Sequence, residues 1–154
     1  MASDMSPEEM AALVRLRFKE LDRGNFKVMD EIFQPSYQFN LPGIPGPLSL
    51  GATKGFYELL YRGFPDLKHD IVEQVAAGDK VVTRWVATGT HSGQFMGVAP
   101  TGKYVEYGGI NIYTVKNRKF ELSHVNWDLL SLFLQIGAVS QNPNLRVATN
   151  PATA

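Results

Sequence analysis

The hydrophobic pattern of the chain changes its period at Pro65, and this change constrains the fold more than any other feature. Before it, apolar residues recur at helical spacing, as in the stripe from Met10 to Leu21. After it come four runs rich in β-branched and aromatic residues, typical of strands: 67–76, 80–91, 103–115 and 119–127. Helices followed by a meander of strands predict an α+β fold, with helices packed on one face of an antiparallel sheet.

Short local signals predict where the helices begin and end. Ser6, Pro7 and Glu9 have the order of a helix cap, a first-turn proline and the acid of a capping box. A second short helix is predicted over 25–33, and a third helix is predicted to be capped by Thr53.

The strand half carries similar signals. A short strand is predicted over 37–41, ahead of a loop rich in Pro and Gly. Gly78-Asp79 and Asn117-Arg118 predict tight turns between neighbouring strands. A closing helix is predicted over 129–136.

Composition excludes several classes of protein. The 154 residues suit one domain, which we expect over 6–137, followed by a loose tail over 138–154. Lys plus Arg and Asp plus Glu each total 15, so there is no concentrated positive field for nucleic acid. There is no cysteine, which excludes disulfides and thiolate chemistry. With no secretory signal pattern and no apolar run of membrane-spanning length, we expect a soluble cytoplasmic protein that binds no membrane.

A series of short motifs between Met10 and Gly137 resembles the SnoaL-like polyketide cyclase branch of the nuclear transport factor 2-like superfamily. The motifs that carry the resemblance are Phe64-Pro65-Asp66-Leu67, Arg84-Trp85, Gly89-Thr90-His91, Gly93, Phe95-Met96-Gly97, Pro100-Thr101-Gly102, Trp127-Asp128 and Gln135-Ile136-Gly137.

The resemblance implies a cone-shaped α+β barrel, in which a curved antiparallel sheet and N-terminal helices enclose an apolar pocket for a small-molecule substrate. Members of the family close polyketide rings by intramolecular aldol chemistry, and relatives act as hydroxylases or as isomerases in terpenoid pathways. The cyclases use an aspartate matching Asp128 as acid and base, with no metal and no cofactor. Their sheets commonly pair, so we expect a homodimer. The chain departs from the common pattern at Asn40, Leu122 and His124, where relatives often carry His, Glu and Trp.

The run before the closing helix contains the predicted catalytic group. Alternate side chains of a strand share a face, so Leu122, His124, Asn126 and Asp128 are predicted to lie on one pocket wall. An apolar wall disfavours the ionised form of a carboxyl group, which would make Asp128 a base nearer neutrality. His124 would orient Asp128 or contact the substrate, and Asn40 and Asn126 would hydrogen-bond the substrate.

Asp128 also has a plain structural interpretation. It directly precedes an apolar helical run, where an Asp commonly accepts backbone N–H bonds as a helix cap. Both roles could hold at once, and the sequence leaves both open.

Other candidates depend on which way a side chain faces. Arg84 would stabilise an enolate if it faced inward, or would be solvated or contact a second subunit if Trp85 faced inward instead. His91 is a candidate substrate contact, although a hydrogen bond that fixes the loop after it is favoured. His69 is expected at the surface. The residues predicted to shape the cavity are Phe18, Phe33, Phe39, Tyr57 and Phe95.

We therefore predict a cofactor-independent cyclase or isomerase of a polyketide- or terpenoid-like metabolite. Limonene-epoxide hydrolases of the same fold carry an Asp where this chain has Val86, which disfavours epoxide hydrolysis. An isomerase similar to ketosteroid isomerase stays open, and His91, His124 and Asp128 show no local spacing of metal ligands. The alternative from another class is a non-catalytic module that binds a small molecule.

Overall fold

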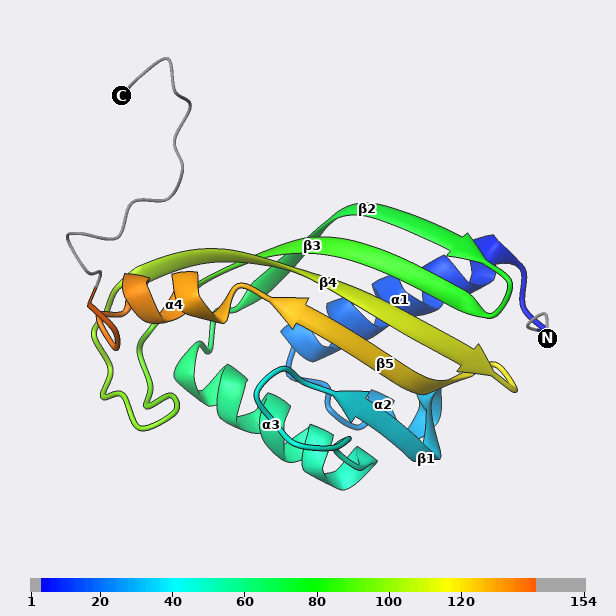
Figure 1. The fold of residues 1–154 in the computed structure, drawn as a ribbon, viewed down its shortest axis with the longest axis horizontal. Helices are drawn as coiled ribbons and strands as arrows, with labels where there is room; N and C mark the ends of the chain where they lie inside the picture. The colour runs from blue at the N-terminus through cyan, green and yellow to red at the C-terminus, as the bar shows by residue number, and fades with distance from the viewer. Residues whose placement is uncertain (1–3, 141–154) are drawn as a thin grey trace, which may run out of the picture.

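The computed structural model describes residues 4–140 (Figure 1). Helices and strands follow in the order α1 (Pro7–Asp22), α2 (Val28–Ile32), β1 (Phe33–Asn40), α3 (Leu50–Gly63), β2 (Lys68–Ala77), β3 (Lys80–Thr90), β4 (Tyr104–Lys116), β5 (Lys119–Trp127) and α4 (Leu129–Gln135). Most of the tail predicted to be loose lies outside the described residues.

The capping box predicted for α1 is confirmed. The Ser6 side chain accepts a hydrogen bond from the backbone N–H of Glu9 at 3.1 Å, and the Glu9 carboxylate accepts from the Ser6 N–H at 2.8 Å. These bonds satisfy two of the N–H groups that a helix start leaves free. The buried residues of α1, among them Met10, Val14 and Phe18, lie on the side of the helix that packs against β2 and β3.

Several predicted boundaries in the helical half are wrong. The second helix, predicted over 25–33, is Val28–Ile32, and the strand predicted over 37–41 is Phe33–Asn40. Ser49, not Thr53, caps α3, and its hydroxyl accepts from the Ala52 N–H at 3.3 Å. Thr53 is buried one turn inside the helix and donates to the Ser49 carbonyl at 2.8 Å. The second helix stops at Ile32, because Phe33 already pairs with Phe120 of the sheet and so begins β1.

The five strands form one sheet in the order β1-β5-β4-β3-β2. The turns at Gly78 and at Asn117-Arg118 are confirmed, and all three residues have the positive φ that such turns require. The expectation of a wholly antiparallel sheet is wrong at one edge, where β1 pairs with β5 in parallel. The reason is topological: α3 and three strands separate β1 from β5 along the chain, so no hairpin connects them.

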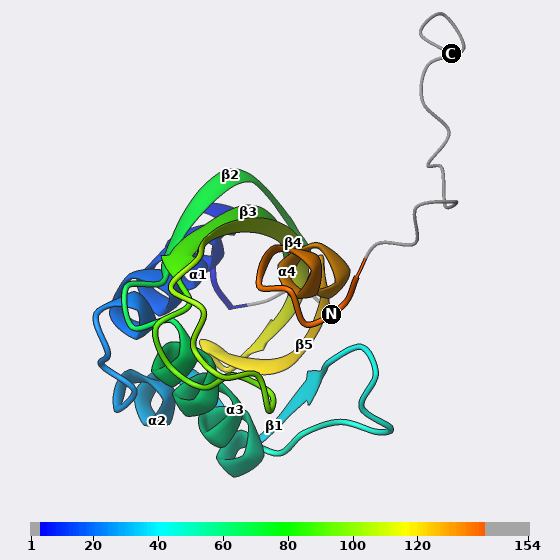
Figure 2. The same ribbon diagram turned by 90° about the vertical axis from the view of Figure 1, so that its left-hand side faces the viewer.

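Seen from one end, the curved sheet partly surrounds α1 and α3, and its two edge strands do not pair with each other (Figure 2). α1 packs against β2 and β3, while α3 packs against β1. The concave face thus covers an apolar core, and the architecture is the expected α+β cone. Within residues 4–140, no helix is both long enough and apolar enough to cross a membrane.

Gly109 of β4 leaves room for the Trp85 ring on the concave face, and its neighbour Gly108 does not contact that ring. A Cβ atom on Gly109 would lie 2.3 Å from the Trp85 ring, whereas one on Gly108 would meet only the Trp85 backbone oxygen at 3.4 Å. The Trp85 indole therefore occupies the space that a side chain at position 109 would need. This close approach positions Trp85 in the interior of the cone.

Candidate active site

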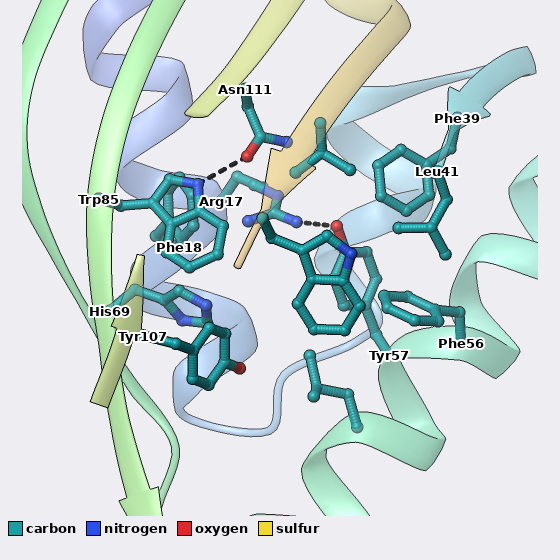
Figure 3. A pocket seen from close by; sticks show the side chains of 13 residues that line it. Arg17, Phe18, Phe39, Leu41, Phe56, Tyr57, His69, Trp85, Tyr107 and Asn111 are labelled. Atoms are coloured by element: carbon teal, nitrogen blue, oxygen red, sulfur yellow. Dashed lines mark hydrogen bonds between the residues drawn. The ribbon is translucent and has the colours of Figure 1, made fainter. Parts of the chain in front are cut away.

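A largely apolar pocket lies between the concave face of the sheet and helices α1 and α3 (Figure 3). Its walls are formed by Arg17, Phe18, Phe39, Leu41, Phe56, Tyr57, Leu60, His69, Trp85, Tyr107, Asn111, Val125 and Trp127. The cavity volume is about 30 Å³. A water molecule needs roughly 10–15 Å³ on this scale, so a metabolite enters only if wall side chains move.

A histidine–aspartate pair lies at one side of this pocket. Asp22 is the last residue of α1, and its Oδ1 lies 2.8 Å from Nδ1 of His69 on β2. The same carboxylate accepts the His69 backbone N–H at 2.8 Å and the hydroxyl of Tyr61, from α3, at 2.6 Å. Three elements therefore meet at one carboxylate, which fixes the position of the imidazole.

The hydrogen bonds also determine the tautomer of His69. Since a carboxylate only accepts, Nδ1 carries the proton and Nε2 of the neutral ring keeps its lone pair. The rings of Phe18 and Trp85 each lie 5.0 Å from the imidazole, measured between centroids. The His69 side chain is 6% exposed, so its free nitrogen is held in an apolar, nearly dry wall.

Burial sets the charges of this pair. Burial disfavours the imidazolium and lowers the pKa of His69, although the Asp22 carboxylate acts in the opposite direction. Burial alone would raise the pKa of Asp22, but the hydrogen bonds from His69 and Tyr61 outweigh it and the pKa is lowered. At neutral pH the pair is a neutral imidazole against an ionised carboxylate, the state a general base requires.

An arginine lies at the other side of the pocket. The Arg17 guanidinium donates to the Tyr57 hydroxyl and lies over the Phe18 and Tyr57 rings, 4.4 and 4.8 Å from their centroids. Burial acts to lower the pKa of Arg17, but the tyrosine oxygens around it outweigh burial and hold the pKa above its ordinary value. A positive charge therefore persists in the interior.

Trp85, not Arg84, faces the pocket. Its indole N–H donates to Oδ1 of Asn111 at 2.6 Å (Figure 3). Arg84 lies on the opposite, exposed face and donates to the Glu73 carboxylate at 3.0 Å. Of the two orientations that the sequence left open for Arg84 and Trp85, the structure has Trp85 inward, so Arg84 does not contribute a cation to the pocket.

The wall predicted from His124, Asn126 and Asp128 does not form. His124 and Asn126 are exposed, whereas Ser123 and Val125, which alternate with them along β5, are buried. The alternation itself is confirmed, but the inward face is the other one. The reason is the register with β4, which places Val125 opposite the buried Asn111 and His124 opposite the exposed Ile112.

Asp128 acts as the helix cap that its position suggested. Its Oδ1 accepts from the Ser131 N–H at 2.9 Å at the start of α4, and its side chain is exposed outside the pocket. Catalysis by Asp128 stays a prediction, without the apolar surroundings expected for it.

The remaining sequence candidates separate into two groups. Phe39 and Tyr57 line the pocket, as does Phe18. Asn40 is half-buried outside the pocket wall and donates weakly to the Ser123 carbonyl, at 3.4 Å. Phe33 packs against Phe120 in the core instead of lining the pocket.

His91 and Phe95 belong to the loop that follows β3. His91 Nδ1 lies 2.9 Å from the Thr101 hydroxyl, and its backbone bonds to both Lys103 and Gly102. These contacts are the loop-fixing bonds favoured for it. Phe95 is buried against Phe64, which follows α3, and does not line the pocket. It packs closely on Gly63, where any larger residue would collide with its side chain.

Arg17 and His69 line the pocket and Asp22 bonds to His69, but the sequence did not predict any of the three as part of the site. The expectation of a surface position for His69 is wrong, since its ring is buried in the pocket wall. A signal existed for Arg17, because it stands on the buried stripe of α1 one turn after Val14, where an apolar residue is expected. Asp22 follows Phe18 by one turn on the same face. No sequence pattern links either residue to His69.

In the described part of the chain, no group of three or more His, Asp or Glu side chains lies close enough together to hold a metal ion.

Comparison with known proteins identifies the family to which the chain is similar. The model of the SnoaL-like polyketide cyclase family matches residues 12–136. A search of curated proteins finds no match.

Solved structures share the fold over most of the chain. IdmH from Streptomyces antibioticus, assigned as a polyketide cyclase, is 28% identical with a TM-score of 0.75, covering 82% of this chain and 97% of IdmH. A protein from Jannaschia sp. CCS1, assigned as a SnoaL-like polyketide cyclase, is 25% identical with a TM-score of 0.80, covering 89% and 99% of the two chains. AclR from Streptomyces galilaeus, assigned as a hydroxylase, is 23% identical with a TM-score of 0.82, covering 90% and 87%, and shows the fold alone.

Proposed function

Since the family match spans most of its length, the chain belongs to the SnoaL-like polyketide cyclase family, and we propose that it is a cofactor-independent cyclase or isomerase with His69 as its base. The observation that carries the proposal is the neutral imidazole held by Asp22 in the wall of an apolar pocket. The substrate is a polyketide- or terpenoid-like carbonyl compound, by family and by the apolar lining.

The proposed step is a proton transfer from carbon. The C–H bond next to a substrate carbonyl breaks, its proton passes to Nε2 of His69, and the electron pair moves to the carbonyl oxygen as an enolate. The imidazolium then returns the proton to the alkoxide formed by aldol closure, or to a different carbon in an isomerisation. Asp22 stabilises the imidazolium between the two transfers, without taking up the proton itself.

Asp128 is the competing candidate for the same role. In this proposal it caps α4, because its carboxylate is exposed and already accepts the Ser131 N–H. Substrate contacts by His124, Asn126 and Asn40 would require a ligand outside the pocket described above, and they stay predictions. A direct comparison of His69 and Asp128 variants decides between the two bases.

The test needs only a probe ketone. Enzyme would be mixed with 2-tetralone in D₂O, and the loss of its α-proton signals followed by NMR. We expect wild type and Asp128→Asn to accelerate the exchange alike, and His69→Asn to lose about 100-fold of the acceleration. Loss of the acceleration in Asp128→Asn, with His69→Asn unaffected, would transfer the role to Asp128.

The capping role of Asp128 and the largely apolar lining of the pocket also support a second candidate, a module that binds a small molecule without converting it. Binding of 2-tetralone without any acceleration of exchange would favour this function.

We also propose a homodimer that pairs through the convex face of the sheet. The support is a row of side chains across β2, β3 and β4, in which Val75, Val82 and Ile112 are exposed and lie in register. His124 and Arg84 lie on this same face. Sedimentation equilibrium of wild type and Ile112→Glu tests it, and a monomeric wild type would refute it.

A further inference from the structure

The guanidinium of Arg17 is a buried charge without a countercharge. The residue is 3% exposed, and it forms no ion pair within residues 4–140. Its one hydrogen-bond partner is the neutral hydroxyl of Tyr57, and its other close neighbours are aromatic rings. Burying an ion without a counterion is costly, and the aromatic faces compensate only part of that cost.

The pocket holds further polar atoms that lack a partner. Nε of Arg17, the hydroxyl of Tyr107 and Nε1 of Trp127 are buried and make no hydrogen bond to any described residue. All three residues line the pocket. Arginine and indole nitrogens can only donate, and burial raises the pKa of Tyr107, so its hydroxyl keeps its proton.

Apart from Nε2 of His69, the main acceptors at the pocket already have donors. Oδ1 of Asn111 accepts the Trp85 indole N–H and the Tyr57 hydroxyl accepts from Arg17 (Figure 3). The Asp22 carboxylate accepts from His69 and Tyr61. The free hydrogen-bonding capacity is therefore mainly donors, together with one net positive charge. Such a set matches a ligand that brings negative oxygen.

We propose that the pocket selects a ligand bearing a carboxylate, and that Arg17 binds this group with the Tyr107 hydroxyl and the Trp127 indole as further donors. As a statement about the substrate, namely that it carries a carboxylate as well as a carbonyl group, this inference rests on the proposed function. As a statement about binding it does not, because no step of proton transfer is involved. The carboxylate would neutralise Arg17 while the carbon skeleton lies against the aromatic walls, next to His69.

The experiment uses an intrinsic reporter. The chain has two tryptophans, Trp85 and Trp127, and both line the pocket, so tryptophan fluorescence reports on its occupancy. The titrants are cyclohexanecarboxylate and its neutral isostere cyclohexanecarboxamide, neither of which absorbs at the wavelengths used. We expect wild type to bind the carboxylate at least about ten times more tightly than the amide. Equal affinity for both, or no binding of the carboxylate, would overturn the proposal without any variant.

Two matched variants locate the effect. Arg17→Met removes the buried charge at nearly constant length, and we expect it to bind both titrants with similar affinity. Arg15→Met makes the same change on the exposed side of α1, where Arg15 bonds to Gln74, and should keep the preference. If Arg17→Met still bound the carboxylate more tightly than the amide, another residue would bind the anion and the assignment to Arg17 would be wrong.

Thermal unfolding separates a binding role from a structural one. Removing an uncompensated buried charge should leave the Tm of Arg17→Met unchanged or higher, whereas a residue needed for packing would lower it. His69→Asn should keep the carboxylate preference while losing the exchange of α-protons. Failure of the base assignment and failure of the anion assignment are thus distinguishable.

Discussion

The two faces of the sheet each present a histidine, and their surroundings differ in every respect that matters for catalysis. On the concave face, His69 is enclosed by aromatic rings and held by a carboxylate. On the convex face, His124 is exposed in a row with Ile112. The residue type is the same in both places, so the chemistry available depends on burial and on the partner at Nδ1. The face of the sheet on which a histidine lies therefore determines its possible catalytic role more than its neighbours in the sequence do.

The largest expected effect separates the two histidines. His69→Asn keeps a donor for Asp22 but removes the free ring nitrogen, so the α-proton exchange of 2-tetralone should slow by about 100-fold. His124→Asn, on the other face, should change the rate less than about 3-fold, within what an exposed substitution usually does. The measurement is the NMR exchange assay with both variants at equal concentration. Equal losses of exchange rate in His69→Asn and His124→Asn would contradict a catalytic role that is specific to His69.

Alanine substitutions at Gly108 and Gly109 test the difference between the two faces of the sheet through the free energy of unfolding. A Cβ on Gly109 collides with the Trp85 ring on the concave side, so Gly109→Ala should destabilise the fold by about 1–3 kcal/mol. Gly108→Ala adds its methyl group where only the Trp85 carbonyl oxygen is near, and should cost less than about 1 kcal/mol. Urea unfolding of both variants gives the comparison. A cost at Gly108 equal to that at Gly109 would contradict the close approach of the ring.

Asp128 should contribute to stability instead of catalysis. Asp128→Ala removes the acceptor for the Ser131 N–H, and the loss of a helix cap costs about 1 kcal/mol. Asp128→Asn keeps an acceptor and should cost a few tenths of that amount. Chemical unfolding measures both, and a larger cost for Asn than for Ala would argue against the cap.

The smallest effect is a dependence of stability on pH. The folded-state pKa of His69 is lowered from its ordinary 6.5, so below pH 6.5 the unfolded chain binds a proton that the folded chain resists. Stability should therefore fall as the pH decreases from 6.5 through the folded-state pKa. The groups that face the imidazole are Asp22, Tyr61 and, at longer range, Arg17 and Asp70. Urea unfolding at pH 7.5 and 5.5 should show a smaller decrease in His69→Asn than in wild type, with His124→Asn as the control.

Much of the fold follows from local signals in the sequence. The capping box at Ser6, the four strand-like runs and the turns at Gly78 and Asn117 act over a few residues, and the structure confirms each of them. The parallel pairing of β1 with β5 does not follow, because it depends on contacts between distant segments such as Phe33 and Phe120. Ser49 was missed as a cap because Thr53 carries an equivalent side chain one turn later.

The candidate site was less predictable for a related reason. Alternation along β5 correctly grouped His124 with Asn126, but only the register with β4 determines which group faces inward. The pairing of Asp22 with His69 joins the end of α1 to the start of β2, although α2, β1 and α3 lie between them in the sequence. A charge on the buried stripe of α1, at Arg17, was the one visible sign of a polar interior.

The parallel edge of the sheet has a consequence for how the protein is made. β1 can complete its ladder only after Phe120 and the rest of β5 have left the ribosome, because no earlier segment pairs with Phe33 in the sheet. Contacts between distant segments form late and slow the folding of a domain. Until then, α1, which carries both Arg17 and Asp22, lacks the part of the pocket wall that Val125 and Trp127 of β5 provide. A nascent chain stopped before Lys119 should therefore expose the aromatic side chains of β1 and α3 to chaperones.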